Sequence, residues 1–216
     1  MEDTKERLAK YILKGHFVLT SRLHSSDYLE KADLYKSDPE LLDEICWEIA
    51  SELSTKFSAF SGNKINAVTA PAPFGAVIAH LVACYLGKFY QDKVMPLFTE
   101  KGKNGHQVFK RGFDQDLKGK NVLVLDDILT TGGTIRQLIN EVTVAGGNVL
   151  AVAVLCLRGE LQAEDLYGLP LISVIDIPMK TWPEEKCPLC KKEALINLSV
   201  GKGAEFLVQH PEYPRE

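Results

Sequence analysis

The feature that most constrains the fold is a stretch in the second half of the chain, residues 122–134. It starts with an uninterrupted apolar run, Val-Leu-Val-Leu, which is typical of a strand buried on both faces. Two carboxylates, Asp126 and Asp127, follow, and a loop of threonines and glycines then leads into a segment with helical spacing. This order of strand, loop and helix predicts an α/β fold with a parallel sheet.

The same alternation of strands and helices extends over residues 64–157, and one more strand is expected in the tail. Apolar runs predict strands at 65–69, 93–98, 122–125, 149–157 and 171–175, and helical spacing predicts helices at 75–86 and 134–145. A short hairpin is expected around Val108 and Phe109. This alternation predicts a parallel sheet core flanked by helices, with right-handed crossovers between the strands.

The two ends of the chain follow a different pattern. We expect a helix over residues 3–14, a short strand at 16–20 and a helix over 39–57 that Asp38 caps. The part after residue 178 is expected to be irregular, because it contains Pro183 and Pro188. The predicted parts are N-terminal helices with a hood segment (1–60), an α/β core (61–160), and a last strand with a C-terminal hood and tail (161–216). The two ends are expected to form a separate small layer beside the sheet.

Composition argues against several classes of protein. The chain has 216 residues, a hydrophobic share of 45% and a formal net charge of −4, whereas proteins that bind nucleic acid or membrane surfaces usually present a basic face. The most apolar stretch, residues 74–87, is too short to span a membrane. The five cysteines suggest no secreted disulfide framework, and the charged first residues do not resemble a signal peptide. A reducing cytoplasm is therefore the expected location, without nucleic acid or membrane partners.

The acid pair and the loop after it predict a binding site for a sugar phosphate, at the carboxyl end of a strand. Glycines let the backbone approach a phosphate, and hydroxyls and a helix N-terminus donate hydrogen bonds to it. Since carboxylates repel phosphate, Asp126 and Asp127 are expected to face sugar hydroxyls or, through water, a Mg²⁺ ion. The alternative is an ordinary strand-to-helix turn with the aspartates as caps. The loop residues are Thr130, Thr131, Gly132, Gly133 and Thr134.

Residues 123–134 resemble the phosphoribosyl-pyrophosphate motif of type I phosphoribosyltransferases, a hydrophobic strand followed by two acids and a Thr/Gly loop. The resemblance implies that Asp126 and Asp127 hold the ribose 2′ and 3′ hydroxyls and that the loop holds the 5′-phosphate. It also implies phosphoribosyl pyrophosphate as a substrate and Mg²⁺ as its cofactor.

A second loop follows the strand expected at 65–69 and opens a helix. It resembles the pyrophosphate loop of the same family, although a glycine or lysine of that pattern is replaced here by Pro73 and Phe74. Its backbone would then have to bind the pyrophosphate. The alternative is a proline-rich structural turn. The candidate residues are Ala72, Pro73, Phe74 and Gly75.

A basic stretch, residues 101–113, stands out in this acidic chain. Its glycines make it mobile, and its cations are suited to closing over a departing pyrophosphate. In orotate phosphoribosyltransferases a basic loop in this region reaches the active site of the partner subunit, which implies a homodimer. The candidates are Lys101, Lys103 and His106, each of which can equally be a solvated surface side chain.

The N-terminal residues 16–31 resemble the opening segment of orotate phosphoribosyltransferases, which forms a hood over the base. In that family an arginine after the strand that follows the phosphate helix contacts orotate, and Arg158 matches it in position. A buried carboxylated pyrimidine needs cationic or N–H partners, for which Thr20 and Lys31 are further candidates. Arg22 departs from the family pattern, which usually has glycine there. Lys31 and Arg22 can equally be exposed surface cations.

Cys187 and Cys190 have the spacing of half a zinc site. A structural zinc ion wants four ligands, and no second cysteine pair follows in the sequence. A subgroup of orotate enzymes has a similar Cys-Pro-Leu-Cys near its C-terminus. The pair is expected to be free thiols in a turn, and a zinc site, or four thiolates pooled by two chains, is the alternative.

The function implied is the transfer of phosphoribose from phosphoribosyl pyrophosphate to orotate, giving orotidine 5′-monophosphate and pyrophosphate in pyrimidine synthesis. One rival is transfer to a purine, because the Asp-Asp-x-x-x-Thr-Gly-Gly-Thr string also resembles adenine enzymes. A second rival is a non-catalytic regulator that senses nucleotides on the same fold. The acid pair and the basic loop favour catalysis.

Overall fold

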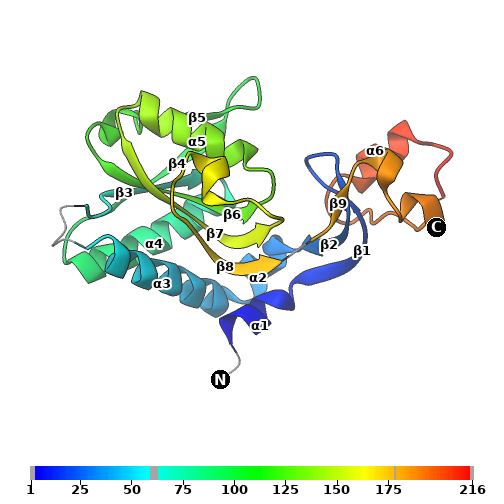
Figure 1. The fold of residues 1–216 in the computed structure, drawn as a ribbon, viewed down its shortest axis with the longest axis horizontal. Coiled ribbons are helices and arrows are strands. Elements are labelled where there is room, and N and C mark those ends of the chain that lie inside the picture. Colours follow the sequence, from blue (N-terminus) through cyan, green and yellow to red (C-terminus); the bar gives the residue numbers. More distant parts are fainter. Residues whose placement is uncertain (1–2, 59–62, 178, 215–216) are drawn as a thin grey trace. The chain divides into compact units, whose positions relative to one another are not determined.

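The computed structural model of the chain describes residues 3–58, 63–177 and 179–214 (Figure 1). The chain forms two compact units. Residues Glu40–Ile177 make up the larger unit, and Met1–Pro39 together with Pro178–Glu216 make up the smaller one. Residues 40–58, which the predicted ranges grouped with the N-terminal layer, belong to the larger unit, as does the strand expected at 171–175.

The larger unit contains a six-stranded sheet in the order β5-β4-β3-β6-β7-β8. Only β5 is antiparallel to its neighbour; the remaining pairs are parallel, as predicted. Apolar runs supply the central strands, and Val122 to Leu125 are fully buried. The strands are β3 (Ala67–Pro71), β4 (Met95–Lys101), β5 (Gln107–Phe109), β6 (Asn121–Leu129), β7 (Asn148–Arg158) and β8 (Leu171–Ile177).

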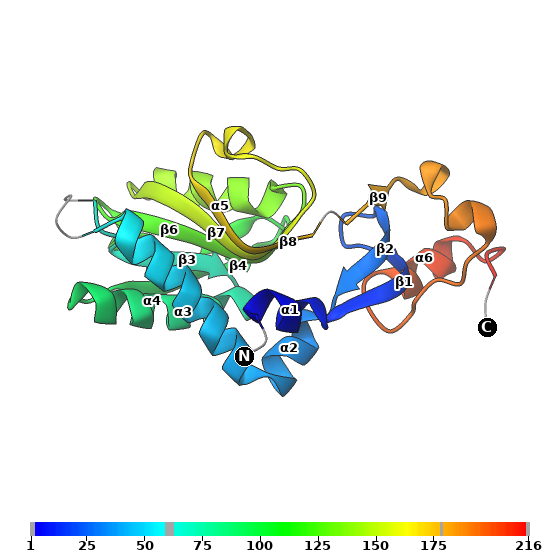
Figure 2. The same cartoon turned by 60° about the horizontal axis from the view of Figure 1, so that its bottom comes forward.

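Three helices cover this sheet: α3 (Pro39–Lys56), α4 (Phe74–Tyr90) and α5 (Gly133–Val144). Figure 2 shows α5 on one face and α3 and α4 on the other. The Tyr85 hydroxyl of α4 donates a 2.6 Å hydrogen bond to the Asp43 carboxylate of α3, and this bond is the main reason that the pKa of Tyr85 is raised to about 12. The mixed α/β architecture predicted from the sequence is confirmed.

Helix α5 allows a matched test of what holds this unit together. Val142 is fully buried in the core under α5, whereas Val144 on the same helix is 77% exposed. Val142→Ala is expected to lower the free energy of unfolding by about 2 kcal/mol, through lost burial and the cavity left behind. Val144→Ala should change it by less than about 0.5 kcal/mol. Urea unfolding followed by circular dichroism measures both, and equal midpoints for the two variants would contradict this packing.

The smaller unit joins both ends of the chain. Its antiparallel sheet has the order β1-β2-β9, with β1 (Ile12–Val18), β2 (His24–Leu29) and β9 (Thr181–Trp182). Its helices are α1 (Thr4–Ala9), α2 (Lys31–Ser37) and α6 (Gly203–Gln209). One apolar cluster of this unit consists of Val18, Ile196, Phe206 and Leu207, with Tyr213 packed against it.

Two predictions for the chain ends were wrong. The helix expected over residues 3–14 ends at Ala9, because Ile12 and Leu13 pair with Leu29 and Tyr28 of β2. The tail beyond residue 178 is not wholly irregular, since it contains β9 and α6. In both places tertiary pairing decides the structure of a segment whose local pattern is ambiguous. No helix within the described parts of the chain is long and apolar enough to cross a membrane.

Candidate active site

The candidate site lies where the sheet changes its direction of growth. The chain passes from β3 to β4 on one side, and β6, β7 and β8 are then added on the other side of β3. Neighbouring β3 and β6 therefore flank a topological switch point, where open α/β sheets bind ligands outside the carboxyl ends of their strands. The loops after β3, β4, β6 and β7 carry most of the predicted site residues.

Asp126 and Asp127 lie near the carboxyl end of β6 and are 9% and 6% exposed. The Asp126 carboxylate accepts a 2.9 Å hydrogen bond from the Asp127 N–H, and the Asp127 carboxylate accepts one of 2.7 Å from the Ile128 N–H. These bonds fix both carboxylates close to the backbone. The acid pair is therefore preorganised to accept hydrogen bonds from ligand hydroxyls.

The loop from Thr130 to Thr134 wraps the N-terminus of α5. Gly132 precedes the helix with a φ of 74°, and no side chain caps the helix there. The positive φ favours glycine at this position, and a Cβ atom there would lie 2.6 Å from Nη1 of Arg136, so the arginine side chain would have to move. The uncapped helix start and the hydroxyls of Thr130, Thr131 and Thr134 form the donor-rich arrangement that suits a phosphate.

Arg136 is a residue that sequence reasoning missed. Its Nη2 donates a 2.6 Å hydrogen bond to the carbonyl of Thr131, which brings a guanidinium group next to the phosphate loop. Nη1 also lies 3.4 Å from the Asp165 carbonyl. The sequence signal that could have found Arg136 is its position one helical turn after Gly132. This cation both braces the loop and adds positive charge beside it.

The loop after β3 offers fewer backbone N–H donors than predicted. Ala72 donates its N–H to the Thr99 carbonyl at 2.8 Å, and Pro73, which has no N–H, follows a cis peptide bond. In this conformation neither residue offers a backbone donor to a pyrophosphate. A Cβ atom on Gly75 would lie 2.8 Å from that of Ala70, so Gly75 permits the close approach of α4 to β3. Pyrophosphate binding by Phe74 and Gly75 stays a prediction.

The basic stretch forms the β4–β5 hairpin and the turn after it. Lys101 pairs with Gln107, and a loop of residues 102–106 joins the two strands. Its base is held by hydrogen bonds from the Thr99 hydroxyl to the Gln107 amide oxygen (2.9 Å) and from the Gln107 N–H to Gln137 of α5 (3.1 Å). Lys101, Lys103 and His106 are exposed. The loop is thus anchored at its base, with exposed cations beyond the carboxyl end of β4.

Not every cation of this stretch is equally exposed to a ligand. Lys110 lies 2.9 Å and Arg111 3.7 Å from the Glu100 carboxylate. The hydrogen bond from Lys110 lowers the pKa of the Glu100 carboxyl. These two cations are therefore engaged with β4, which makes Lys110 a suitable control for the loop cations.

Arg158 ends β7 and is only 5% exposed. A Cβ atom on the next residue, Gly159, would lie 3.9 Å from the Thr130 carbonyl, so the end of β7 lies beside the phosphate loop. Burial raises the pKa of the Cys156 thiol to about 12, while Arg158 lowers it and Asp176 and Asp127 raise it slightly. The charges of Arg158, Asp127 and Asp176 therefore all act on Cys156.

The candidates for the base hood, Thr20 and Lys31, belong to the smaller unit. Thr20 is exposed after β1, and Lys31 is half-buried at the start of α2. Their contact with a base stays a prediction. Arg22 has a φ of 67°, which explains a glycine in the family pattern, and its side chain approaches Glu205 (3.6 Å) and Gln209 (3.4 Å) of α6. It thus faces its own unit.

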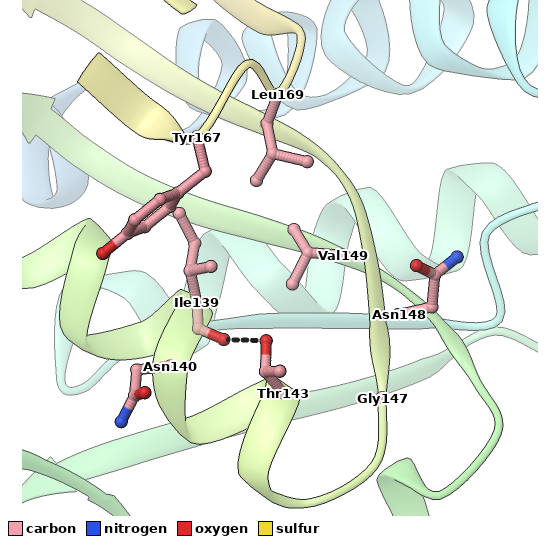
Figure 3. A pocket seen from close by; sticks show the side chains of 8 residues that line it. All are labelled: Ile139, Asn140, Thr143, Gly147, Asn148, Val149, Tyr167 and Leu169. Atoms are coloured by element: carbon pink, nitrogen blue, oxygen red, sulfur yellow. Dashed lines mark hydrogen bonds between the residues drawn. The ribbon is translucent and has the colours of Figure 1, made fainter. Parts of the chain in front are cut away.

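A pocket of about 410 Å³ lies elsewhere, between the end of α5, the start of β7 and the segment before β8 (Figure 3). It is at the amino end of β7, opposite the end that carries Arg158. The Thr143 hydroxyl, which lines the pocket, donates a 2.7 Å hydrogen bond to the Ile139 carbonyl. None of the lining residues carries a charge. We assign no catalytic role to it.

Comparisons with known proteins agree with this geometry. Residues 38–185 match the model of the phosphoribosyl transferase domain. The chain is 34% identical over 181 residues to the orotate phosphoribosyltransferase of Caldanaerobacter subterraneus, covering 84% of this chain and 86% of that protein. It is 36% identical over 179 residues to that of Chlorobium phaeobacteroides, covering 83% of each.

Solved structures share the fold. Orotate phosphoribosyltransferase of Mycobacterium tuberculosis superposes with a TM-score of 0.60 at 19% identity, covering 81% of this chain and 94% of that one. Adenine phosphoribosyltransferase of Thermoanaerobacter pseudethanolicus superposes with a TM-score of 0.58 at 21% identity, covering 80% of this chain and 99% of that one. The family match, the identities over most of the chain and the switch-point site together place this chain in the phosphoribosyltransferase family.

Proposed function

We propose that this chain is an orotate phosphoribosyltransferase, which joins the phosphoribosyl group of phosphoribosyl pyrophosphate to orotate. The observation that carries the proposal is the meeting, at one edge of the sheet, of a buried acid pair, a phosphate loop and a buried arginine. These groups match the three parts of the two substrates: ribose hydroxyls, 5′-phosphate and the carboxylate of orotate. The 34% identity to an orotate enzyme supports the same assignment.

The reaction is a displacement at ribose C1. Pyrophosphate leaves, a nitrogen of the base attacks, and the configuration inverts, through a transition state that resembles an oxocarbenium ion. Asp126 and Asp127 orient the ribose, and the α5 loop binds the 5′-phosphate. Arg136 adds positive charge beside that loop. The protein therefore contributes positioning and charge stabilisation rather than a covalent nucleophile.

Magnesium is the proposed cofactor. The acid pair provides oxygen atoms, which are the ligands Mg²⁺ prefers, and the ion is usually held largely by substrate phosphates and water. Asp126 and Asp127 would face such an ion through water while they hold the sugar. When bound, Mg²⁺ neutralises charge on the pyrophosphate.

Arg158 favours orotate over a purine. The structural neighbours include adenine enzymes, so the fold alone does not choose the base. A buried guanidinium at the rim of the site provides the partner that a carboxylated pyrimidine needs, and a neutral purine has no group that requires it.

We also propose that the protein acts as a homodimer in which the exposed hairpin cations reach the partner's site. A reducing compartment such as the cytoplasm suits the chain, because none of its five cysteines forms a disulfide. Gel filtration with light scattering tests the dimer: a monomeric mass at working concentration contradicts it.

Pyrophosphate release with phosphoribosyl pyrophosphate, Mg²⁺ and one base at a time tests the function. Release with orotate but not with adenine, guanine or uracil supports the proposal. Release with adenine alone would contradict the proposal and identify the chain as a purine phosphoribosyltransferase. Tight binding of phosphoribosyl pyrophosphate without release with any base would indicate a sensor.

The hairpin cations are expected to act in turnover. A variant with Lys101, Lys103 and His106 all replaced by alanine should lose about 100-fold in kcat, because it loses positive charge near the leaving pyrophosphate. Lys110→Ala, which removes a cation engaged with Glu100, should stay within about threefold of the parent enzyme. Steady-state rates measure both variants. An unchanged kcat in the triple variant would remove the loop from the mechanism.

A further inference from the structure

Four metal-ligating side chains meet in the smaller unit. His16 lies on β1 and His24 on β2, while Cys187 and Cys190 follow β9 in the C-terminal segment. One ligand atom from each of the four lies within 4.8 Å of the others. Strand β9 pairs with β2, with Trp182 opposite His24, and this pairing brings the cysteine turn to the histidines.

The distances within this cluster suit a tetrahedral metal ion. Nε2 of His16 lies 2.9 Å from Nδ1 of His24, and the Cys190 sulfur lies 3.2 Å from the same Nδ1. The sulfurs of Cys187 and Cys190 lie 3.6 and 3.7 Å from Nε2 of His16. Zinc bonds of about 2.3 Å to sulfur and about 2.0–2.1 Å to nitrogen place tetrahedral ligand atoms about 3.3–3.8 Å apart. Small side-chain adjustments are enough to admit the ion.

A hydrogen bond outside the cluster orients one of the ligands. Nδ1 of His16 lies 2.8 Å from the Ala194 carbonyl, to which it can only donate. With the proton on Nδ1, a neutral His16 ring directs the lone pair of Nε2 at the other three ligands. This is the arrangement by which backbone carbonyls commonly fix metal-binding histidines.

Three of the four ligands are buried, and Cys190 is half-buried. His16, His24 and Cys187 are 3%, 1% and 0% exposed, and the His24 ring packs edge-on against Phe206, with the ring centroids 5.0 Å apart. Two thiolates and two neutral imidazoles also balance the charge of a divalent ion, so no net charge is buried. Four protein ligands leave no open position on a tetrahedral ion, which is typical of a structural site rather than a catalytic one.

We propose that His16, His24, Cys187 and Cys190 bind one structural Zn²⁺ ion per chain. The ion would join His16 and Cys187, which are 171 residues apart, and so link the N-terminal and C-terminal segments of this unit. Metal binding by such a unit contributes directly to its folding. The proposal does not depend on the identity of the base, because the ligands lie outside the phosphate and acid loops.

Metal analysis of the purified chain is the first test. Protein produced with zinc and dialysed without chelator should contain about one zinc per chain. Cobalt titrated into the metal-free chain should give intense visible bands and a sulfur-to-cobalt charge-transfer band, as tetrahedral thiolate ligation requires. In a Trp47→Phe background, Trp182, which pairs with His24, should report metal removal by a change in its fluorescence.

Two serine substitutions provide a matched comparison. Cys190→Ser should reduce the zinc content to below about 0.1 per chain, whereas Cys84→Ser, which alters an exposed thiol on α4, should leave it unchanged. If Cys190→Ser does not fold, the cobalt spectrum of the unaltered chain still decides the question. A chain without zinc, a cobalt spectrum like that of the hydrated ion, or a Cys187–Cys190 disulfide in place of metal would each overturn the proposal.

Discussion

Asp127→Asn is expected to lower kcat/KM for phosphoribosyl transfer by about 100-fold or more. Asparagine keeps the shape of aspartate, but it replaces a charged acceptor by a neutral amide, and hydrogen bonds to charged groups are worth about 1.5–3 kcal/mol. It also removes negative charge that stabilises the cationic character developing on the ribose. Orientation and electrostatics therefore fail together, and most of the loss should appear in kcat.

Steady-state kinetics and calorimetric titration with phosphoribosyl pyrophosphate measure this effect. Asp116→Asn is the matched control, because Asp116 is an exposed aspartate in the short 3-10 helix Gln115–Leu117 that precedes the amino end of β6. Its rate should stay within about twofold of the parent enzyme. If Asp127→Asn turned over at the same rate as this control, the assigned role of the acid pair would be refuted.

Arg158→Gln is expected to raise the KM for orotate by about 100-fold, with little change in the affinity for phosphoribosyl pyrophosphate. Truncating one partner of a buried charge pair typically costs about 2–5 kcal/mol, because the other charge is left without a counterion. Arg158 is 5% exposed and lies beside the phosphate loop, so water cannot easily replace it. The loss should therefore fall on the substrate that carries the carboxylate.

Arg158→Lys serves as the conservative comparison. Lysine keeps the charge but lacks the planar fork of donors, and it should recover part of the orotate affinity. Because Arg158 is buried, thermal unfolding of each variant should accompany the kinetics. An orotate KM unchanged in a folded Arg158→Gln variant would assign base recognition to other residues and reopen the purine alternative.

The phosphate site could be read largely from local sequence. An apolar run, two acids and a Thr/Gly loop specify a strand, its end and a helix start, because side-chain period and turn conformation are set by neighbouring residues. The φ of 74° at Gly132 is a local requirement of this kind. Arg136 was missed because its contact with Thr131 depends on how the loop folds back on α5.

The ends of the chain show where local reasoning fails. Ile12 and Leu13 fit a helical spacing, yet they lie in β1, because their backbone pairs with that of β2. Likewise, the prolines after residue 178 led to the prediction of an irregular tail, although β9 and α6 form there. Short segments with weak periodicity take the structure that their tertiary partners provide.

The sequence by itself determined the α/β core and the acid–phosphate loop, since both depend on residues close together in the chain. Only the tertiary structure decided that the half-site Cys187 and Cys190 meets His16 and His24. No spacing rule links residues so far apart. Their meeting follows from strand pairing and burial, which are fixed by the lowest free energy of the whole unit rather than by any local pattern.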